Sequence, residues 1–252
     1  MMPLLRTGNG KVLAQLAWSR VLVAFDFDGT LAPIVTERDE ARMRARTAEL
    51  FARVCSLYPS AIISGRSRLD VLSRLGCAQV KYVVGNHGLE PGATTEDFER
   101  DVATARAVLA ERLESWSGIE VEDKRYSLAI HYRKSRSKRM ARAAIHETIA
   151  GLPIRMRIVP GKLVVNVLPD LAPNKGHALL GLRTLEQADT ALYVGDDATD
   201  EDVFKLDQPG RLLSVRVGES LSSSASYFLR HQNEVDRLLA KLVSYREKGT
   251  WT

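Results

Sequence analysis

The sequence predicts an α/β protein in which a doubly wound parallel sheet is interrupted by a smaller α+β domain. Short apolar runs alternate with helical patterns in residues 1–91, and the same alternation resumes in residues 174–252. Strands that alternate with helices form βαβ units and parallel sheets. Residues 92–173 instead contain a helix followed by two strands, twice over. At 252 residues and 45% hydrophobic composition, the chain can bury one large core or two modest ones.

The first part of the chain begins with the apolar run 21–26, which ends near the Gly29 turn. A run of this length bounded by a glycine is typical of a strand buried on both faces of a parallel sheet. Four further elements follow from the same patterns. They are helix 46–57, strand 60–64, helix 67–75 and strand 81–85.

The middle part repeats one unit, an amphipathic helix followed by two strands. The unit is predicted first as helix 98–115 with strands 119–123 and 126–133, and then as helix 136–150 with strands 154–160 and 162–168. Pro160-Gly161 is a turn dipeptide and is predicted to join the last two strands. The repeat predicts a small α+β domain with its helices on one face of its sheet.

The last part returns to alternating strands and helices. The predicted elements are helix 175–183, strand 190–195, helix 200–206, strand 212–217 and a closing helix near 232–246. Together with the first part, they complete the doubly wound sheet.

Two carboxylates stand where the first strand ends, Asp26 and Asp28, on either side of Phe27. Because side chains alternate along a strand, both are expected on one side. In an open α/β sheet the ligand crevice lies beyond the carboxyl ends of the strands. Two adjacent buried carboxylates need a cation or a shared proton. We therefore expect a Mg²⁺-assisted site in which one Asp attacks and the other handles a proton. An ordinary Asp-Gly turn is the alternative.

Three further patterns follow in chain order. Ser64-Gly65-Arg66 ends a short apolar strand, Lys175 opens an apolar helix pattern, and a last apolar run enters a cluster of five acids in 196–202. Such a cluster beside Asp26 would be self-repulsive without a divalent cation. Hard oxygen ligands favour Mg²⁺ over a soft metal. An acidic helix N-terminus is the alternative for this stretch.

The four patterns, in this order, resemble the motifs of the haloacid dehalogenase (HAD) superfamily of phosphotransferases. The resemblance implies that Asp26 is a nucleophile that forms an aspartyl phosphate and that Asp28 is the general acid and base. It implies that Ser64 and Lys175 bind the phosphoryl group and that Thr30 fixes the loop. The implied Mg²⁺ ligands are Asp26, the backbone carbonyl of Asp28, Asp196, Asp197 and Asp200.

From Val21 to about Gly218, the chain is similar to the trehalose-6-phosphate phosphatase family within this superfamily. The similarity rests on the Ser64-Gly65-Arg66 pattern and four longer ones: DFDGTLAPI from Asp26, GNHGLE from Gly85, LAIHYR from Leu128 and GDDATDED from Gly195. It implies a HAD-like core, 1–91 and 174–252, with an inserted α+β cap at 92–173 that selects the substrate. The implied substrate is a small-molecule sugar phosphate, with trehalose 6-phosphate first.

The family resemblance also implies a set of substrate contacts. They are Gly65, Arg66, Asn86, His87, Gly88, His131, Arg133, Lys162 and Asn166. The alternative for His87 is a purely structural role in a turn. The alternative for His131 and Arg133 is that they lie on a solvent-exposed face of a strand. Asn166 departs from the family pattern, which has a Glu there. Since a carboxylate accepts two strong hydrogen bonds and an amide offers one acceptor, another glycosyl phosphate, such as glucosylglycerol phosphate or sucrose phosphate, stays open as the substrate.

Charge and composition set the remaining expectations. A formal net charge of +5 suits a phosphorylated substrate. The densest basic cluster, 133–139, lacks interleaved aromatics, which disfavours specific nucleic-acid binding. The sequence has no signal-like segment, no run of 18 apolar residues and no disulfide framework, so we expect a cytoplasmic monomer without a membrane partner. A nucleic-acid phosphatase and a HAD-fold binding protein without catalysis are the alternatives from other classes.

Overall fold

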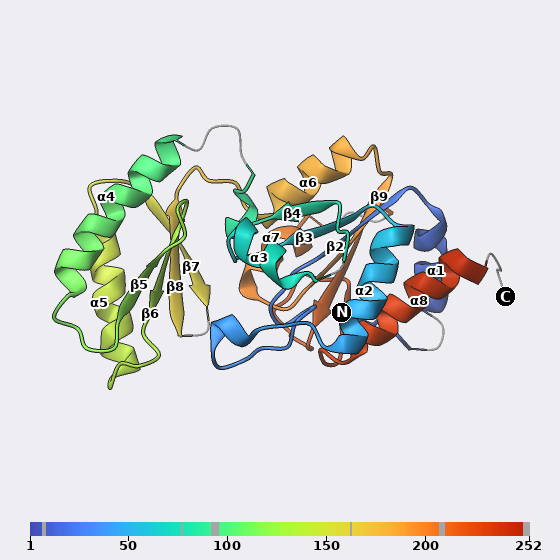
Figure 1. Ribbon diagram of the computed structural model, residues 1–252, viewed down its shortest axis with the longest axis horizontal. Coiled ribbons are helices and arrows are strands. Elements are labelled where there is room, and N and C mark those ends of the chain that lie inside the picture. The colour runs from blue at the N-terminus through green and yellow to red at the C-terminus, as the bar shows by residue number, and fades with distance from the viewer. Residues whose placement is uncertain (7–8, 77, 92–95, 162, 207–209, 249–252) are drawn as a thin grey trace. The chain divides into compact units, whose positions relative to one another are not determined.

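The first apolar run of the sequence becomes an inner strand of a parallel sheet (Figure 1). The computed structural model describes residues 1–6, 9–76, 78–91, 96–161, 163–206 and 210–248. Within these residues the sheet has seven strands in the order β1-β11-β10-β9-β2-β3-β4, and all neighbours are parallel. The strands are β1 (Met2–Pro3), β2 (Val21–Phe25), β3 (Ser60–Ile63), β4 (Tyr82–Val84), β9 (Thr190–Gly195), β10 (Leu212–Val217) and β11 (Tyr227–Leu229).

Helices cover both faces of this sheet, and each face has its own apolar core. Val21, Val23 and Phe25 pack on the side of α1 (Gly10–Trp18), α2 (Ala45–Leu57), α3 (Arg68–Arg74) and α8 (Glu234–Lys248). Leu22 and Ala24 pack on the side of α6 (Lys175–Leu185) and α7 (Glu201–Phe204). Because both faces are covered, every residue of β2 is buried, as its continuous apolar run predicts. The predicted doubly wound α/β fold is confirmed.

A four-stranded antiparallel sheet forms a second compact unit, Pro91–Ala172, which we call the insert. In the described residues its strand order is β5-β6-β8-β7. Its elements are α4 (Glu96–Leu113), β5 (Glu120–Asp123), β6 (Leu128–His131), α5 (Lys138–Ala150), β7 (Met156–Gly161) and β8 (Val164–Pro169). Apolar residues of α4 and α5 pack with Leu128, Ile130, Val165 and Val167, so the helices lie on one face of the sheet, as predicted. Met1–Glu90 and Pro173–Thr252 form the other unit.

The position of one predicted turn is wrong. Pro160-Gly161 is not the turn but the end of β7, where Pro160 pairs with Val165 and Gly161 with Val164. The chain reverses afterwards, and Leu163 has a positive φ of 61°. Strand β7 is at the edge of the described sheet, where a proline that lacks an N–H breaks no ladder on its free side.

In the described residues outside the insert, two strands and one α-helix are absent from the sequence predictions. They are β1, α1 and β11. Strand β1 has two residues, and its backbone pairs with Tyr227 and Phe228 more than 200 positions away. The predicted helix 200–206 begins instead as a 3₁₀ turn, η3 (Ala198–Asp200), and continues as α7 for four residues. Among the described residues, no helix has both the length and the hydropathy needed to cross a bilayer.

Candidate active site

Asp26 follows β2 directly and lies at the carboxyl edge of the parallel sheet. Its backbone N–H donates to the carbonyl of Val194 on β9 (2.8 Å), so the sheet pairing continues through this residue. Its Oδ1 accepts a hydrogen bond from the N–H of Phe27 at 2.7 Å, and the residue is buried. The neighbouring strand β9 ends at Gly195 and delivers the acidic cluster to the same edge.

Three carboxylates meet at this edge. Each of Asp26, Asp196 and Asp200 offers an oxygen, and these oxygens all lie within 4.8 Å of one another. Two glycines make room for them. A Cβ on Gly29 would lie 2.0 Å from Oδ2 of Asp196, and a Cβ on Gly195 would lie 2.3 Å from Cγ of Asp200. A larger residue at Gly29 or at Gly195 would therefore collide with one of these carboxylates.

Lys175 is the cation among these acids. Its Nζ lies 2.7 Å from Oδ1 of Asp200 and 3.2 Å from Oδ2 of Asp26, and the side chain is 1% exposed. The hydroxyl of Tyr193 donates to the same Oδ1 of Asp200 at 2.6 Å. One buried ammonium thus faces three carboxylates, and the cluster carries an excess of negative charge when all of them are ionised.

The pKa directions follow from that excess. Burial raises the pKa of Asp26 well above its ordinary value, and the positive charge of Lys175 opposes this only in part. Burial, with the charges of Asp200 and Asp197, raises the pKa of Asp196 to about 7. Burial works against the charge of Lys175, but Asp200 and Asp26 outweigh it, so the pKa of Lys175 is raised and the ammonium stays charged. A further cation beside Asp26 and Asp196 would relieve the repulsion, and an all-oxygen donor set fits a hard divalent metal ion.

Thr30 and Ser64 complete the predicted catalytic set, and both are buried. The hydroxyl of Thr30 donates to Oδ1 of Asp196 at 3.2 Å. Its carbonyl accepts from Nε2 of Gln232 at 2.8 Å, which ties the loop after β2 to the segment before α8. Gln232 was not predicted, since no motif surrounds it. Ser64 follows β3, and its Oγ accepts from the N–H of Arg66 at 3.1 Å.

The turn after β4, η2 (Asn86–Gly88), packs against Ser64. The N–H of His87 donates to the carbonyl of Ser64 at 2.9 Å, and the N–H of Asn86 donates to the carbonyl of Arg66 at 2.8 Å. A Cβ on Gly65 would lie 2.4 Å from Cε1 of His87, so the imidazole lies over that glycine. The structure thus brings the predicted residues of this turn together with the Ser64-Gly65-Arg66 pattern.

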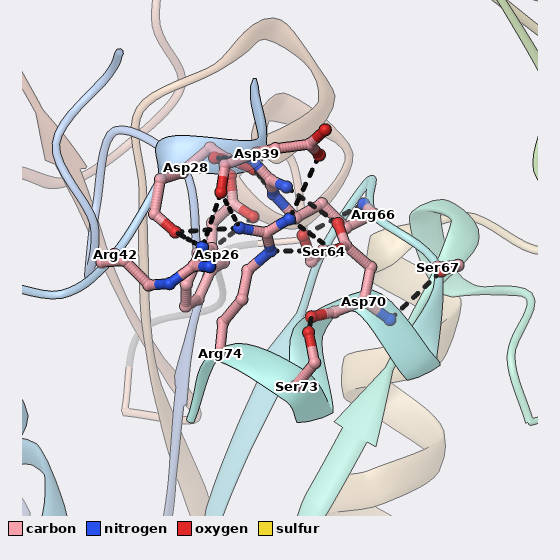
Figure 2. Close-up of polar contacts among 12 residues, drawn as sticks. Asp26, Asp28, Asp39, Arg42, Ser64, Arg66, Ser67, Asp70, Ser73 and Arg74 are labelled. Carbon is pink, nitrogen blue, oxygen red and sulfur yellow. Dashed lines mark hydrogen bonds and ion pairs between the residues drawn. The ribbon is translucent and has the colours of Figure 1, made fainter. Parts of the chain in front are cut away.

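Arg66 lies between two carboxylates (Figure 2). Its Nε and Nη2 donate to the two oxygens of Asp28 at 2.6 and 2.7 Å, and its Nη1 donates to Asp70 at 2.8 Å. Asp70 also accepts from Nε of Arg74 at 2.8 Å. Neither Asp70 nor Arg74 was predicted as a site residue. Asp70 lies four residues after Arg66, and Arg74 lies four residues after Asp70 on the predicted helix 67–75. This spacing is the signal that could have found them.

Asp197 takes a local role at the start of η3. Its Oδ1 accepts from the N–H of Ala198 at 2.5 Å, while its own N–H donates to Oδ2 of Asp200 at 2.8 Å. Burial is the main cause that raises the pKa of Asp197. Its oxygens are not part of the three-carboxylate group found in the described residues. Asp197 as a metal ligand stays a prediction.

Of the substrate contacts predicted in the insert, His131 and Asn166 lie on strands of its sheet. Nε2 of His131 on β6 lies 2.9 Å from Oε2 of Glu122 on β5. Asn166 on β8 is buried, pairs with Ala129, and donates from Nδ2 to the carbonyl of Val159 at 3.4 Å. Arg133 is exposed, and Lys162 lies outside the described residues. Asn166 and His131 share the sheet face opposite the α4 and α5 core.

Comparison with known proteins gives a consistent family. The family model described as trehalose-phosphatase matches residues 24–233. The trehalose-phosphate phosphatase of Mycobacterium avium (strain 104) is 34% identical over 243 residues, which cover 91% of this chain and 59% of that protein. The probable trehalose-phosphate phosphatase 9 of Oryza sativa subsp. japonica is 30% identical over 277 residues, which cover 94% of this chain and 74% of that protein. The chain therefore spans less than two thirds of the mycobacterial relative.

A solved structure supports the fold. The C-terminal domain of trehalose-6-phosphate phosphatase from C. albicans superposes with a TM-score of 0.78, covering 97% of this chain and 98% of that one. Sequence identity over the superposition is 22%, so this likeness concerns the fold alone.

Proposed function

The chain belongs to the trehalose-phosphatase family, and from that premise we propose that it hydrolyses a sugar phosphate, trehalose 6-phosphate first, to the free sugar and inorganic phosphate. One observation carries the proposal: the buried group of Asp26, Asp196 and Asp200 around the ammonium of Lys175. Surplus negative charge at the carboxyl edge of a parallel sheet suits a site where a metal ion and a phosphate bind together.

The proposed cofactor is Mg²⁺. Asp26, the backbone carbonyl of Asp28 and Asp196 would hold it, with Asp200 beside them and Asp197 as a further candidate. When bound, Mg²⁺ would supply positive charge that offsets the repulsion between the phosphate and the carboxylates. Two observations support a metal ion at this site. The three carboxylates lie close together, and without a further cation the pKa of Asp26 and that of Asp196 are raised.

Asp26 is the proposed nucleophile. One of its oxygens, Oδ1, is held by the N–H of Phe27, and Oδ2 lies 3.2 Å from the ammonium of Lys175. We propose that Asp26 attacks phosphorus, the bond from phosphorus to the sugar oxygen breaks, and an aspartyl phosphate forms. Lys175 and Ser64 stabilise the charge on the remaining phosphoryl oxygens.

Asp28 is the proposed general acid and base. In the first step its proton passes to the departing sugar oxygen, which leaves as an alcohol. In the second step a water attacks the phosphorus of the aspartyl phosphate, and Asp28 accepts the proton of that water. Inorganic phosphate leaves and Asp26 is regenerated, so that both side chains return to their starting protonation states.

We propose that the insert selects the sugar through Asn166, His131, Arg133 and Lys162. Gly65, Asn86, His87 and Gly88, with Arg66, stay proposed contacts on the other unit. Asn166 is the one specific observation that favours a second candidate, a phosphatase for sucrose phosphate or glucosylglycerol phosphate. A buried amide offers a sugar one acceptor where the family pattern has two anionic oxygens.

A monomeric state and a cytoplasmic location stay predictions.

The test is phosphate release from a panel of trehalose 6-phosphate, sucrose 6-phosphate, glucosylglycerol phosphate, glucose 6-phosphate and a 5′-phosphorylated oligonucleotide. Each is measured with Mg²⁺ and after chelation. Asp26→Asn is expected to abolish release while the fold is kept. Asp236→Asn is the matched control, because Asp236 lies in the same unit and pairs with Arg44 and Thr47 away from the cluster. Release that survives in Asp26→Asn would contradict the mechanism, and preference for another sugar would select the second candidate.

A further inference from the structure

Outside the acidic cluster, the described residues contain a second, linear network of charges. It runs from Asp28 through Arg66 and Asp70 to Arg74 and ends on backbone carbonyls of the loop before α2 (Figure 2). Its first member is the proposed general acid, whereas Asp70 and Arg74 lie on α3 and belong to none of the motifs. The geometry points to a positioning role: Asp70 and Arg74 orient Arg66, and Arg66 in turn fixes the carboxyl group of Asp28. This inference rests on the proposed function and deepens it.

The contact between Arg66 and Asp28 fixes a direction as well as a distance. Two parallel hydrogen bonds, of 2.6 and 2.7 Å, join the two oxygens of Asp28 to Nε and Nη2. Such a bidentate pair defines the plane of the carboxylate, which a single contact from a lysine would not do. The side chain of Arg66 is 4% exposed and that of Asp28 is 41% exposed. Asp28 is thus held from its buried side and open on the other.

The guanidinium of Arg66 is itself held from behind. Its Nη1 donates to Oδ2 of Asp70 at 2.8 Å, and its Cζ lies 5.8 Å from the centroid of the Phe27 ring. Burial alone would disfavour the charge of Asp70, but hydrogen bonds from Arg74 and Arg66 outweigh it and hold the pKa of Asp70 below its ordinary value. Asp70 therefore stays ionised as the acceptor between two arginines.

Arg74 anchors the far end of the network. Its Nε donates to Oδ1 of Asp70 at 2.8 Å, and its Nη1 donates to the carbonyls of Asp39 and Ala41 at 2.9 and 3.1 Å. These carbonyls do not titrate and belong to a loop that Arg42 also binds through its Nη1. Because Arg66, Asp70 and Arg74 are spaced by four residues, the last two share one side of α3. The helix thus acts as a rigid support for the arginine that holds Asp28.

The test measures release of the leaving group in the first turnover, with enzyme in excess, for two substrates. One is the sugar phosphate that the wild type hydrolyses, and the other is p-nitrophenyl phosphate, whose leaving group departs without protonation. Misplacing a general acid slows the first reaction and spares the second. We expect Asp70→Asn to slow first-turnover sugar release by roughly tenfold or more, with a much smaller effect on p-nitrophenolate and on the KM of the sugar phosphate.

Asp236→Asn is the matched control, because its side chain is 21% exposed against 22% for Asp70 and also accepts from an arginine. It is expected to cost similar thermal stability and to slow neither reaction selectively. Asp70→Glu keeps the carboxylate and should recover part of the rate. If Asp70→Asn does not fold, Arg74→Lys is measured instead, since an ammonium cannot hold both Asp70 and the loop carbonyls in the same way.

Equal slowing of both substrates by Asp70→Asn, or no slowing of either, would overturn the inference. Selective slowing by Asp236→Asn would overturn it as well, because the effect would then come from stability alone. Failure of the proposed function looks different. A wild type that hydrolyses p-nitrophenyl phosphate and another alkyl phosphate, but no trehalose 6-phosphate, overturns the proposed substrate, and the network is then tested on that alkyl phosphate. A wild type that releases neither leaving group overturns both.

Discussion

The ammonium of Lys175 lies 2.7 Å from Oδ1 of Asp200, and both side chains are almost completely buried. Lys175 opens α6, whose first turn is capped by Asn174, and Asp200 ends the 3₁₀ turn after β9. The pair therefore joins two motifs that are 25 residues apart. The ammonium of Lys175 lies farther from Oδ2 of Asp26, at 3.2 Å. Asp200 thus holds the lysine in place, and the second oxygen of Asp26 keeps a weaker contact that suits a reacting group.

Replacing Lys175 by Met should abolish phosphate release and destabilise the fold. The change leaves the carboxylates of Asp26 and Asp200 buried without their cation, and breaking a buried pair costs about 3–5 kcal/mol of unfolding free energy. Chemical denaturation measures that loss, and a phosphate assay measures activity. Lys11→Met, on an exposed position of α1, is the control and should change neither. A Lys175→Met protein with full activity would contradict the assignment of this lysine.

The metal-free chain should lose stability as the pH rises through the titration of Asp196. Its folded pKa of about 7 lies above the ordinary value of 3.8, so the folded state binds more protons than the unfolded state between these two values. The contribution of Asp196 is therefore fully present below pH 4 and is lost as the pH rises to about 7. The unfolding free energies of the wild type and of Asp196→Asn are compared from pH 4 to 8 after chelation. The difference between their pH dependences gives the contribution of Asp196.

In that comparison, Asp196→Asn should lose less unfolding free energy than the wild type as the pH rises. Adding Mg²⁺ to the wild type at pH 8 should restore stability, because an ion that binds the folded state alone stabilises it. Parallel pH curves for the two proteins would show that Asp196 does not titrate in this range.

Gly29→Ala should remove activity through one steric contact. Gly29 has a φ of +76°, and its Cβ would lie 2.0 Å from Oδ2 of Asp196. Gly218 has a φ of +86° and no atom within 4 Å of its Cβ, so Gly218→Ala carries the backbone strain alone, about 1–2 kcal/mol. We expect both variants to lose stability and only Gly29→Ala to lose phosphate release. Equal activity in the two variants would mean that Asp196 can move without consequence.

The edge of the sheet where the acids meet could be predicted from local patterns. Strands β2 and β9 are continuous apolar runs, and each is followed by an Asp at or near its end, so their carboxyl ends are expected to lie together. The structure pairs Phe25 with Val194, which places Asp26 and Asp196 at the same edge. The family resemblance depends on the same short motifs, and each motif is contiguous in the chain, so no long-range contact is needed to recognise it.

The structural features that the sequence did not predict depend on contacts between residues far apart in the chain. Strand β1 has two residues and exists because Tyr227 and Phe228 lie beside it. The contact from Gln232 to Thr30 crosses 202 positions of the chain. The four-residue spacing of Arg66, Asp70 and Arg74 is visible in the sequence, but their contact with Asp28 depends on the fold. Local propensity carries no information about such long-range contacts.

Asn166→Glu should raise the preference for trehalose 6-phosphate. Asn166 is buried on β8, and its amide donates a long hydrogen bond, 3.4 Å, to the carbonyl of Val159. A Glu at this position would restore the charged acceptor of the family pattern, and a hydrogen bond to a charged group contributes about 1.5–3 kcal/mol. We therefore expect kcat/KM for trehalose 6-phosphate to rise by roughly tenfold or more relative to sucrose 6-phosphate.

Asn166→Asp is the matched control, since it carries the same charge on a side chain shorter by one methylene and should give a smaller change. If trehalose 6-phosphate is already the best substrate of the wild type and Asn166→Glu lowers its kcat/KM, the amide itself recognises the sugar. Because Asn166 shares its sheet face with His131, that result would make His131→Ala the next variant to measure. An unchanged preference in both variants would remove Asn166 from the set of specificity residues.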